Sequence, residues 1–254
     1  EMLAFSQGVT RRGSYAGYLE VNHPEIEEFL DVRKPTGGDV NRKSVNLHHG
    51  VTIGNDFMEL IEQATLVEGF DDSWDLIDPH TGVVKKTVSA KTLWVKLIQN
   101  RVETGEPYIM YKDTVQNALP EYQKDMGLTV HHSNLCSEIT LPTDKDRTAV
   151  CCLSSVNLEE YDEWCNDDQF IPDLIRMLDN VLTYFIDKAP PELYRAVFSA
   201  ENERSLGLGA MGFHAYLQRQ DIAFESMWAS SANHKMFSRI KSEATRATKQ
   251  LAKE

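Results

Sequence analysis

Cysteine is scarce in this chain, and long apolar runs are missing from it. Only four cysteines occur among 254 residues, unevenly spaced at positions 136, 151, 152 and 165. Few, irregular cysteines are typical of a reducing compartment in which thiols do chemistry, so we predict a cytoplasmic protein. No run of about 18 apolar residues exists, and the first residues lack the features of a signal peptide. The sequence therefore predicts neither a membrane span nor secretion.

Basic residues are outnumbered by acidic ones. The 39 acidic and 26 basic side chains give a net charge of −13, which argues against a nucleic-acid-binding surface. A spaced set of four Cys and His residues is also missing. The pairs His48-His49 and His131-His132 are therefore interpreted as polar loop or strand-end residues, and no metal site is predicted. The 41% hydrophobic content is enough for a sizeable core.

Helical and extended patterns alternate along the chain. Asn55 and Ser89 are interpreted as helix N-caps, residues 107–110 as a strand, and the apolar positions of residues 174–186 as a core helix. A long amphipathic helix is predicted from about Ala232 onward. Alternating strands and helices favour an α/β architecture.

A glycine pattern at residues 207–212 satisfies the G-x-G-x-x-G signature of dinucleotide binding. That signature carries weight only when it follows a hydrophobic strand within a compact βαβ unit. Here it follows the polar run Glu201-Asn-Glu-Arg204. The glycines are therefore interpreted as allowing close helix packing.

The most informative pattern is an amide, a thiol and a carboxylate at Asn134, Cys136 and Glu138. In an extended backbone these alternate positions point to the same side, whereas in a helix Cys136 would lie roughly opposite the other two. A strand or loop is therefore predicted. The carboxylate can take a proton from a hydroxyl, the amide can orient it, and the thiol can act as nucleophile, hydrogen donor or radical carrier, which suits a sugar. The alternative is a buried inert cysteine beside an exposed glutamate.

A second thiol-bearing segment lies at residues 149–158. It is rich in β-branched and small residues and is interpreted as a buried strand. Vicinal Cys151 and Cys152 would then point to opposite faces, one to a pocket and one to the packing. A hairpin-like return could bring Cys151 and Cys136 into one pocket. The alternative is two small buried apolar side chains.

Taken together, these segments resemble a known family. Ser-Asn-Leu-Cys-Ser-Glu-Ile, followed by Ala-Val-Cys-Cys-Leu-Ser-Ser-Val-Asn-Leu, is similar to the finger loop and following strand of the large (α) subunit of ribonucleotide reductase. Residues 5–13 resemble its specificity loop, residues 103–113 the segment before the finger loop, and residues 204–214 a following helical segment. The resemblance covers essentially the whole chain. It implies an incomplete ten-stranded β/α barrel with the finger loop in the barrel interior, and residues 1–254 as a single partial catalytic barrel domain.

The resemblance implies roles for the finger-loop residues. Cys136 would carry the transient thiyl radical that removes the 3′ hydrogen of a ribonucleotide. Glu138 would be the base on the 3′ hydroxyl, and Asn134 would hydrogen-bond the ribose. These roles agree with what the three side chains can do.

Four other residues take roles from the same resemblance. Cys151 would be one member of the redox pair that supplies two electrons and becomes a disulfide, with its partner supplied by an upstream segment. Cys152 falls one place off that position and would serve packing. Gln7 and Arg11 match the specificity-loop residues that touch the substrate base and relay the identity of the effector.

Partners and cofactors also follow from the resemblance. No cofactor is expected in this chain: a metal-containing small (β) subunit would supply the radical, thioredoxin or glutaredoxin would be the external reductant, and nucleoside triphosphates would be effectors. The expected partners are the ribonucleotide substrate, the β subunit, the remaining portion of the α subunit and a second copy in an α dimer. The Ser-Asn-Leu-Cys form of the loop is closer to the oxygen-dependent class I than to the cobalamin-dependent class.

The chain opens directly at the specificity-loop segment and closes inside a continuing helix. We therefore expect a piece of a larger polypeptide, inactive and poorly soluble when isolated. Two functions remain open: a catalytic piece of ribonucleoside-diphosphate reductase, and a non-catalytic interaction fragment that binds reductase subunits without turnover. The intact set Asn134, Cys136, Glu138 and Cys151 favours the first.

Overall fold

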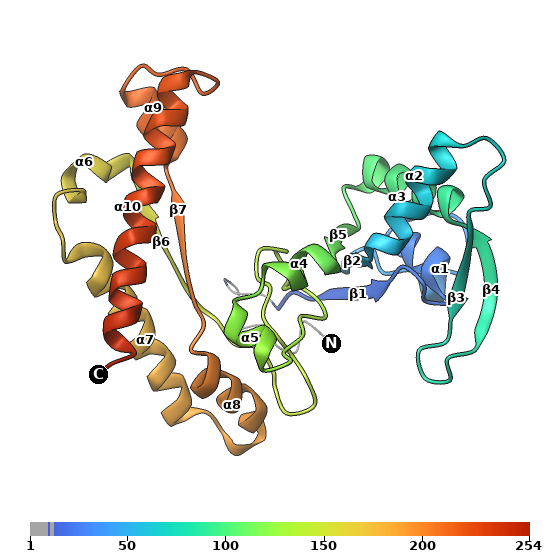
Figure 1. Cartoon of the computed structure of the whole chain (residues 1–254), viewed down its shortest axis with the longest axis horizontal. Coiled ribbons are helices and arrows are strands. Elements are labelled where there is room, and N and C mark those ends of the chain that lie inside the picture. The colour runs from blue at the N-terminus through green and yellow to red at the C-terminus, as the bar shows by residue number, and fades with distance from the viewer. Residues whose placement is uncertain (1–9, 11–12) are drawn as a thin grey trace. The chain divides into compact units, whose positions relative to one another are not determined.

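The structure, a computed structural model, describes residue 10 and residues 13–254 (Figure 1). Gln7 and Arg11 lie outside the described residues, so their predicted roles stay predictions. The chain divides into two compact units, Glu1–Thr143 and Asp144–Glu254. Each unit has its own sheet and its own helices, and the expectation of one barrel domain also stays a prediction.

A three-stranded parallel sheet is the centre of the first unit. Its strands follow the order β1-β2-β5. They are β1 (Ala16–Glu20), β2 (His48–Ile53) and β5 (Tyr108–Tyr111). Parallel neighbours need long crossover connections. These crossovers contain α1 (Ile26–Leu30), the short 3₁₀ helix η2 (Val40–Arg42), α2 (Asn55–Leu66), the strands β3 (Ser73–Ile77) and β4 (Val84–Ser89), and α3 (Ala90–Thr104). The strand predicted at residues 107–110 is confirmed as β5.

One face of this sheet packs on the crossover helices. Alternate strand residues such as Val51 and Ile53 are fully buried in a core with Phe57 of α2 and Leu97 of α3. The helix α3 begins where predicted, because the Ser89 hydroxyl accepts a hydrogen bond from the Thr92 amide at 3.1 Å. The predicted cap of α2 is wrong by one residue: Gly54 is the N-cap and Asn55 is the first helical residue.

The other face of the sheet is covered by the chain that follows β5. The helices α4 (Lys112–Ala118) and α5 (Glu121–Asp125) precede an irregular stretch that contains Val130. Met110, Leu119 and Val130 form a second buried cluster, against which Tyr18 of β1 packs. The first unit therefore has a sheet with both faces covered, the arrangement usual for parallel sheets.

The second unit is built on two parallel strands and a set of helices. The strand β6 (Cys152–Asn157) pairs with β7 (Leu206–Met211). Between them lie η3 (Leu158–Glu160), α6 (Tyr161–Trp164), α7 (Phe170–Lys188), η4 (Pro191–Leu193) and α8 (Tyr194–Glu203), and after them α9 (Phe213–Arg219) and α10 (Met227–Leu251). The predicted core helix at residues 174–186 is confirmed as part of α7.

Three expectations for this unit need correction. The strand predicted at residues 149–158 is shorter and only half buried, because one of its faces is uncovered. Residues 204–214 are not a helical segment: they form β7 and lead into α9. The long helix α10 begins at Met227 instead of Ala232, since the Ser226 hydroxyl accepts a hydrogen bond from the Ala229 amide at 3.2 Å.

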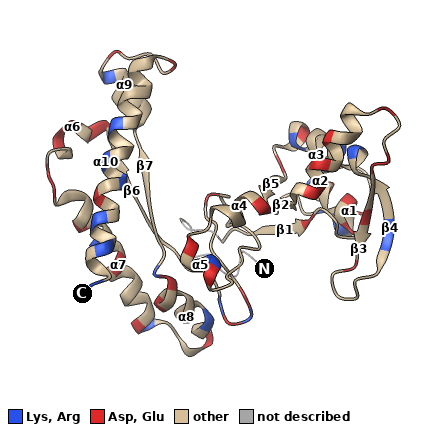
Figure 2. Cartoon of the chain, viewed as in Figure 1, with Lys and Arg blue, Asp and Glu red and all other residues tan. Residues whose placement is uncertain are grey.

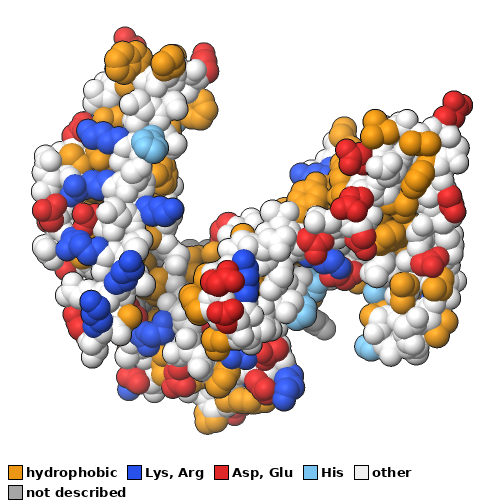
Figure 3. Space-filling view, viewed as in Figure 1, with side chains coloured by type: hydrophobic (Ala, Val, Ile, Leu, Met, Phe, Trp, Pro, Cys, Tyr) orange, Lys and Arg blue, Asp and Glu red, His pale blue; other side chains and the backbone are white. Residues whose placement is uncertain are grey.

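The helices α7 and α10 cover one face of the β6-β7 pair. Val156 of β6 is buried with Ile171 and Ile175 of α7 and with Met236 of α10. Lys and Arg residues recur along α10 (Figure 2). Apolar side chains are also exposed on the surface (Figure 3). The most exposed large apolar residues of the second unit are Met227 (89%), Trp228 (75%), Tyr184 (66%) and Phe224 (64%).

Candidate active site

The segment around Cys136 is a loop organised by the side chain of Asn134. The Asn134 Oδ1 atom accepts hydrogen bonds from the backbone N–H groups of Glu138 and Ile139, both at 3.1 Å. The Asn134 carbonyl oxygen accepts another from the Ser137 amide at 3.2 Å. These bonds close a turn with Cys136 at its tip. Asn134 is the type of residue whose side chain replaces a backbone partner in such turns.

The prediction of a strand or loop is confirmed, since the segment is a loop, but its backbone makes a turn and is not extended. Ser137 has φ of 67°, in the left-handed region that is uncommon for residues other than glycine, and it reverses the chain after Cys136. The alternation of side chains in an extended strand therefore does not apply, although the exclusion of a helix holds. Asn134, Cys136 and Glu138 therefore share a local turn and not one face of a strand.

The loop leaves its thiol and carboxylate open to a reactant. The Cys136 and Glu138 residues are exposed, and Asn134 is half buried. Because the Asn134 Oδ1 atom is committed to the loop, the amide has its Nδ2 group to offer as a donor. The chemistry available is an accessible sulfur, a proton acceptor and a hydrogen-bond donor within one turn.

Cys136 lies near the first residue of β5. Burial raises the pKa of Tyr108, and the negative charges that Glu106 and Cys136 can carry raise it further. The ring of Tyr108 in turn stacks on His48, with centroids 6.4 Å apart and planes within 3°. The Cys136 thiol therefore lies within electrostatic range of the Tyr108 side chain.

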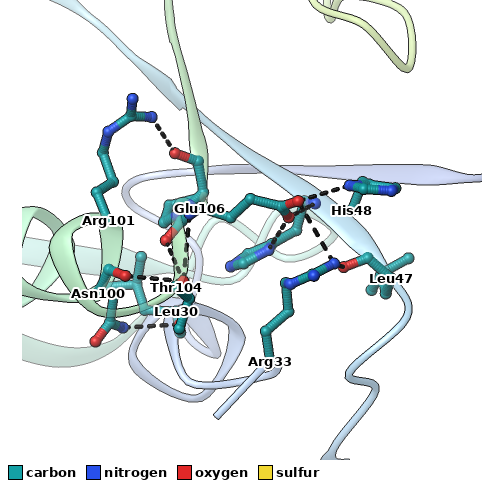
Figure 4. A network of polar contacts seen from close by, with 10 residues as sticks. Leu30, Arg33, Leu47, His48, Asn100, Arg101, Thr104 and Glu106 are labelled. Atoms are coloured by element: carbon teal, nitrogen blue, oxygen red, sulfur yellow. Dashed lines mark hydrogen bonds and ion pairs between the residues drawn. The ribbon is translucent and has the colours of Figure 1, made fainter.

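A polar network that the sequence reasoning missed lies where β2 and β5 begin (Figure 4). The Glu106 carboxylate is 2.6 Å from His48 Nδ1 and 3.2 Å from His49 Nδ1, accepts a bond from the His49 amide at 3.1 Å, and pairs with Arg33 at 3.4 Å. The only signal in the sequence was an acidic residue just before a strand, together with a histidine pair. Nothing in the spacing of residues 48 and 106 indicated their contact.

Burial and charge act in opposite directions within this network. Burial pushes the pKa of Glu106 up, but bonds from His48 and His49 and the charge of Arg33 bring it below its usual value. Burial lowers the pKa of His49, whose ring is fully buried, and the neighbouring Glu106 only partly offsets this. The pair was expected at a strand end, and His48 does begin β2; His49 instead is a core residue.

The vicinal cysteines of the second unit face different environments. Cys152 opens β6, and with alternate positions 154 and 156 it faces the helix-covered side, where burial raises the pKa of its thiol. Cys151 lies just before the strand on the other side, with Leu153. A Cβ placed on Gly207 of β7 would lie 3.4 Å from the Cys151 sulfur and 2.2 Å from Leu153 Cδ2. The glycine therefore leaves room for these two side chains.

The predicted site residues thus fall into three groups. Asn134, Cys136 and Glu138 meet in one loop of the first unit, and Cys151 lies in the second unit. Gln7 and Arg11 are outside the described residues. The expectation that Cys136 and Cys151 share a pocket stays a prediction.

Two features are absent from the described residues, 10 and 13–254. No group of three or more His, Cys, Asp or Glu side chains is arranged to hold a metal ion there. In the same part of the chain, every helix is too short or too polar to cross a bilayer.

Comparisons with known proteins agree with the architecture. The sequence model of the family "Ribonucleotide reductase, barrel domain" matches residues 2–254. The large subunit of ribonucleoside-diphosphate reductase from invertebrate iridescent virus 3 is 46% identical over 98% of this chain, and the one from Trypanosoma brucei brucei is 28% identical over 96%. The chain spans 47% and 31% of the lengths of these relatives.

A solved structure is similar over nearly the same range. The class Id ribonucleotide reductase alpha subunit of Actinobacillus ureae superposes with a TM-score of 0.79 at 36% identity, covering 95% of this chain and 41% of that one. The prediction of an α/β fold of the ribonucleotide reductase barrel type is thereby confirmed. From its family match over residues 2–254, this chain belongs to the ribonucleotide reductase barrel domain family.

Proposed function

We propose that this chain supplies the catalytic barrel of a ribonucleoside-diphosphate reductase large subunit. The observation that carries the proposal is the exposed Cys136 thiol at the tip of a turn built by Asn134, with the exposed Glu138 two residues further along the same loop. Similarity to reductase large subunits across the whole chain supports it. The product would be a deoxyribonucleotide for DNA synthesis.

The three loop residues would act on the ribose of the substrate. Cys136, as a thiyl radical, removes the 3′ hydrogen atom and returns one at the end of the cycle. Glu138 takes the proton of the 3′ hydroxyl. Asn134 donates from Nδ2 to a ribose oxygen, because its Oδ1 holds the loop.

Cys151 would supply half of the reducing equivalents. Replacing the 2′ hydroxyl by hydrogen needs two electrons and two protons, and the hydroxyl leaves as water. Two thiols provide both and become a disulfide, so Cys151 needs a partner thiol. The upstream part of the subunit would contribute it, and thioredoxin or glutaredoxin would reduce the disulfide again in the cytoplasm.

Other parts of the enzyme would complete the reaction. A metal-containing β subunit would generate the radical that reaches Cys136. Gln7 and Arg11 would contact the substrate base and respond to a nucleoside triphosphate effector in an α dimer. The described residues supply the loop that receives the radical and hold it against a sheet with both faces covered.

The test is Cys136→Ser in the full-length subunit, reconstituted with its β subunit and a thiol reductant. We expect no detectable deoxynucleotide, because an alkoxyl radical is much harder to form than a thiyl radical. Cys165→Ser, which changes a half-buried thiol after α6, is the matched control and should keep normal turnover. Measurable turnover in Cys136→Ser would remove the radical assignment. A wild-type protein that binds the β subunit but forms no product would favour the non-catalytic alternative.

A further inference from the structure

A tyrosine of β1 holds the start of the Cys136 loop against the sheet. The Tyr18 hydroxyl donates a hydrogen bond to the Asn134 carbonyl oxygen at 2.9 Å. Its ring stacks on the His132 imidazole, with centroids 5.6 Å apart and planes at 20°. His132 Nδ1 in turn lies 3.3 Å from Thr52 Oγ1 of β2. Tyr18 of β1 therefore holds Asn134, and Thr52 of β2 contacts His132, two residues earlier in the segment that leads into the loop.

Gly50 of β2 makes room for this arrangement. In the parallel register Gly50 lies opposite Tyr18. A Cβ on Gly50 would lie 2.4 Å from Tyr18 Cε1 and 2.6 Å from Cδ1, far inside van der Waals contact. Glycine weakens the interior of a strand and often marks a close approach by another group. Here the absent side chain lets the tyrosine ring lie across β2, toward the loop.

One carbonyl group, that of Asn134, connects the Tyr18 hydrogen bond to the turn that contains the Cys136 thiol. The Asn134 carbonyl oxygen accepts both the Tyr18 hydroxyl and the Ser137 amide, which uses its two lone pairs. The second of these bonds closes the turn that contains Cys136. Because Cys136 is exposed, the backbone of this turn, and not side-chain packing, sets the position of its sulfur. Moving the Asn134 carbonyl would move the thiol.

We propose that Tyr18 is a positioning residue for the Cys136 thiol, with Gly50 and His132 completing a support that fixes the loop to β1 and β2. The proposal rests on the proposed function, in which the sulfur must reach one particular hydrogen of a ribose. Reacting atoms must approach to about 3–3.5 Å, and a misplacement of about 1 Å can cost roughly 10²-fold in rate. A loop tied to paired strands keeps such a position better than a free loop.

Tyr18→Phe in the reconstituted full-length enzyme tests the support. The change deletes the hydroxyl but keeps the ring that stacks on His132. We expect kcat to fall about 3- to 30-fold, in keeping with the loss of one hydrogen bond, while KM for the ribonucleotide changes less than about twofold. Gly50→Ala, which pushes the ring away from β2, should lower kcat at least as much. Tyr184→Phe, on a ring of α7 that is 66% exposed, is the matched control and should change neither constant.

Amide hydrogen exchange separates positioning from general loss of stability. In Tyr18→Phe the amides of Ser137, Glu138 and Ile139 should exchange faster, while those of β1 and β2 keep their protection. Faster exchange across the whole sheet would show ordinary destabilisation and overturn the proposal. If Tyr18→Phe keeps its kcat while Cys136→Ser is inactive, the positioning role of Tyr18 is overturned but the proposed function is not. Retained turnover in Cys136→Ser would instead remove the proposed function, and with it the catalytic meaning of the support.

Discussion

The two parallel sheets of this chain differ in what covers their second face. In the first unit, one face of β1-β2-β5 packs on the crossover helices, and the chain from Met110 to Val130 covers the other. In the second unit, α7 and α10 cover one face of β6-β7. The opposite face presents Leu153, which is 57% exposed, beside Gly207 and Gly209.

This difference separates two ways of presenting a thiol. In the first unit, the loop that carries Cys136 is hydrogen-bonded to Tyr18 of β1, and the cysteine lies on a turn of its own outside the strands. The uncovered face of the second sheet presents Cys151 directly, at the start of a strand whose neighbour has glycines in place of bulky side chains. The loop thiol depends on hydrogen bonds for its position, whereas the strand thiol depends on the register of β6 and β7.

The strongest test of the second arrangement compares the vicinal cysteines. Cys151→Ala should block multi-turnover reduction in the full-length enzyme even when the protein is folded, because the electrons that leave with the product then lack a dithiol source. Cys152→Ala should retain turnover and cost on the order of 1 kcal/mol in the free energy of unfolding, as a packing change on the covered face. Deoxynucleotide formed per enzyme over many cycles is the measurement.

Disulfide mapping gives the same comparison without mutation. After one turnover in the absence of external reductant, the new disulfide should join Cys151 to a cysteine of the upstream segment. Cys152 in that disulfide would show that the faces of β6 have been assigned the wrong way round.

The first arrangement is tested by Glu138→Gln, which keeps the shape of the loop and deletes the base. We expect the rate of nucleotide reduction to fall roughly 10²- to 10⁴-fold. Glu121→Gln, at an exposed carboxylate of α5, is the control and should leave the rate unchanged. A near-normal rate for Glu138→Gln would mean that this carboxylate has a structural role only.

The contrast between covered and uncovered faces can be measured along one strand. Val156→Ala removes two methyl groups from a residue that is 2% exposed, and should cost about 2–3 kcal/mol in the free energy of unfolding. Leu153→Ala, on the other face of β6, should stay within about 0.5 kcal/mol. Urea unfolding of both variants is the measurement. Equal losses would contradict the contrast and show that other parts of the subunit cover Leu153.

The smallest expected effect is a pH dependence of the free energy of unfolding, caused by His49 in the three-stranded sheet of the first unit. Burial lowers the pKa of His49 in the folded protein, so below its ordinary value of about 6.5 the unfolded chain binds a proton that the folded chain does not. Stability should therefore fall as the pH drops below about 6.5, by at most about 1.4 kcal/mol per pH unit for this one group.

His49→Gln supplies the control for this pH dependence. It keeps a donor for Glu106 without the titration, so the fall between pH 7 and pH 5.5 should be smaller than in the wild type. An identical fall in both proteins would assign the dependence to groups other than His49.

Local sequence signals predicted those elements whose causes are local. The Ser89 cap, the strand at residues 107–110 and the apolar periodicity of α7 all appeared in the structure, since caps and periodicity act within a few residues. The strand β7 was missed, because its glycines look unfavourable for a strand until the side chains of β6 that fill their space are known. The Glu106 network was missed because its members lie 57 and 58 residues apart.

By itself, the sequence determined which chemical groups are available: an amide, a thiol and a carboxylate in one short segment, and a pair of vicinal thiols after it. Only the tertiary structure decided how they are held. Residues distant along the chain hold them: Tyr18 donates a hydrogen bond to Asn134, 116 residues later, and Gly207 leaves room beside Cys151. Contacts of this kind form only when packing brings strands and loops together, and no pattern within a short window of sequence contains them.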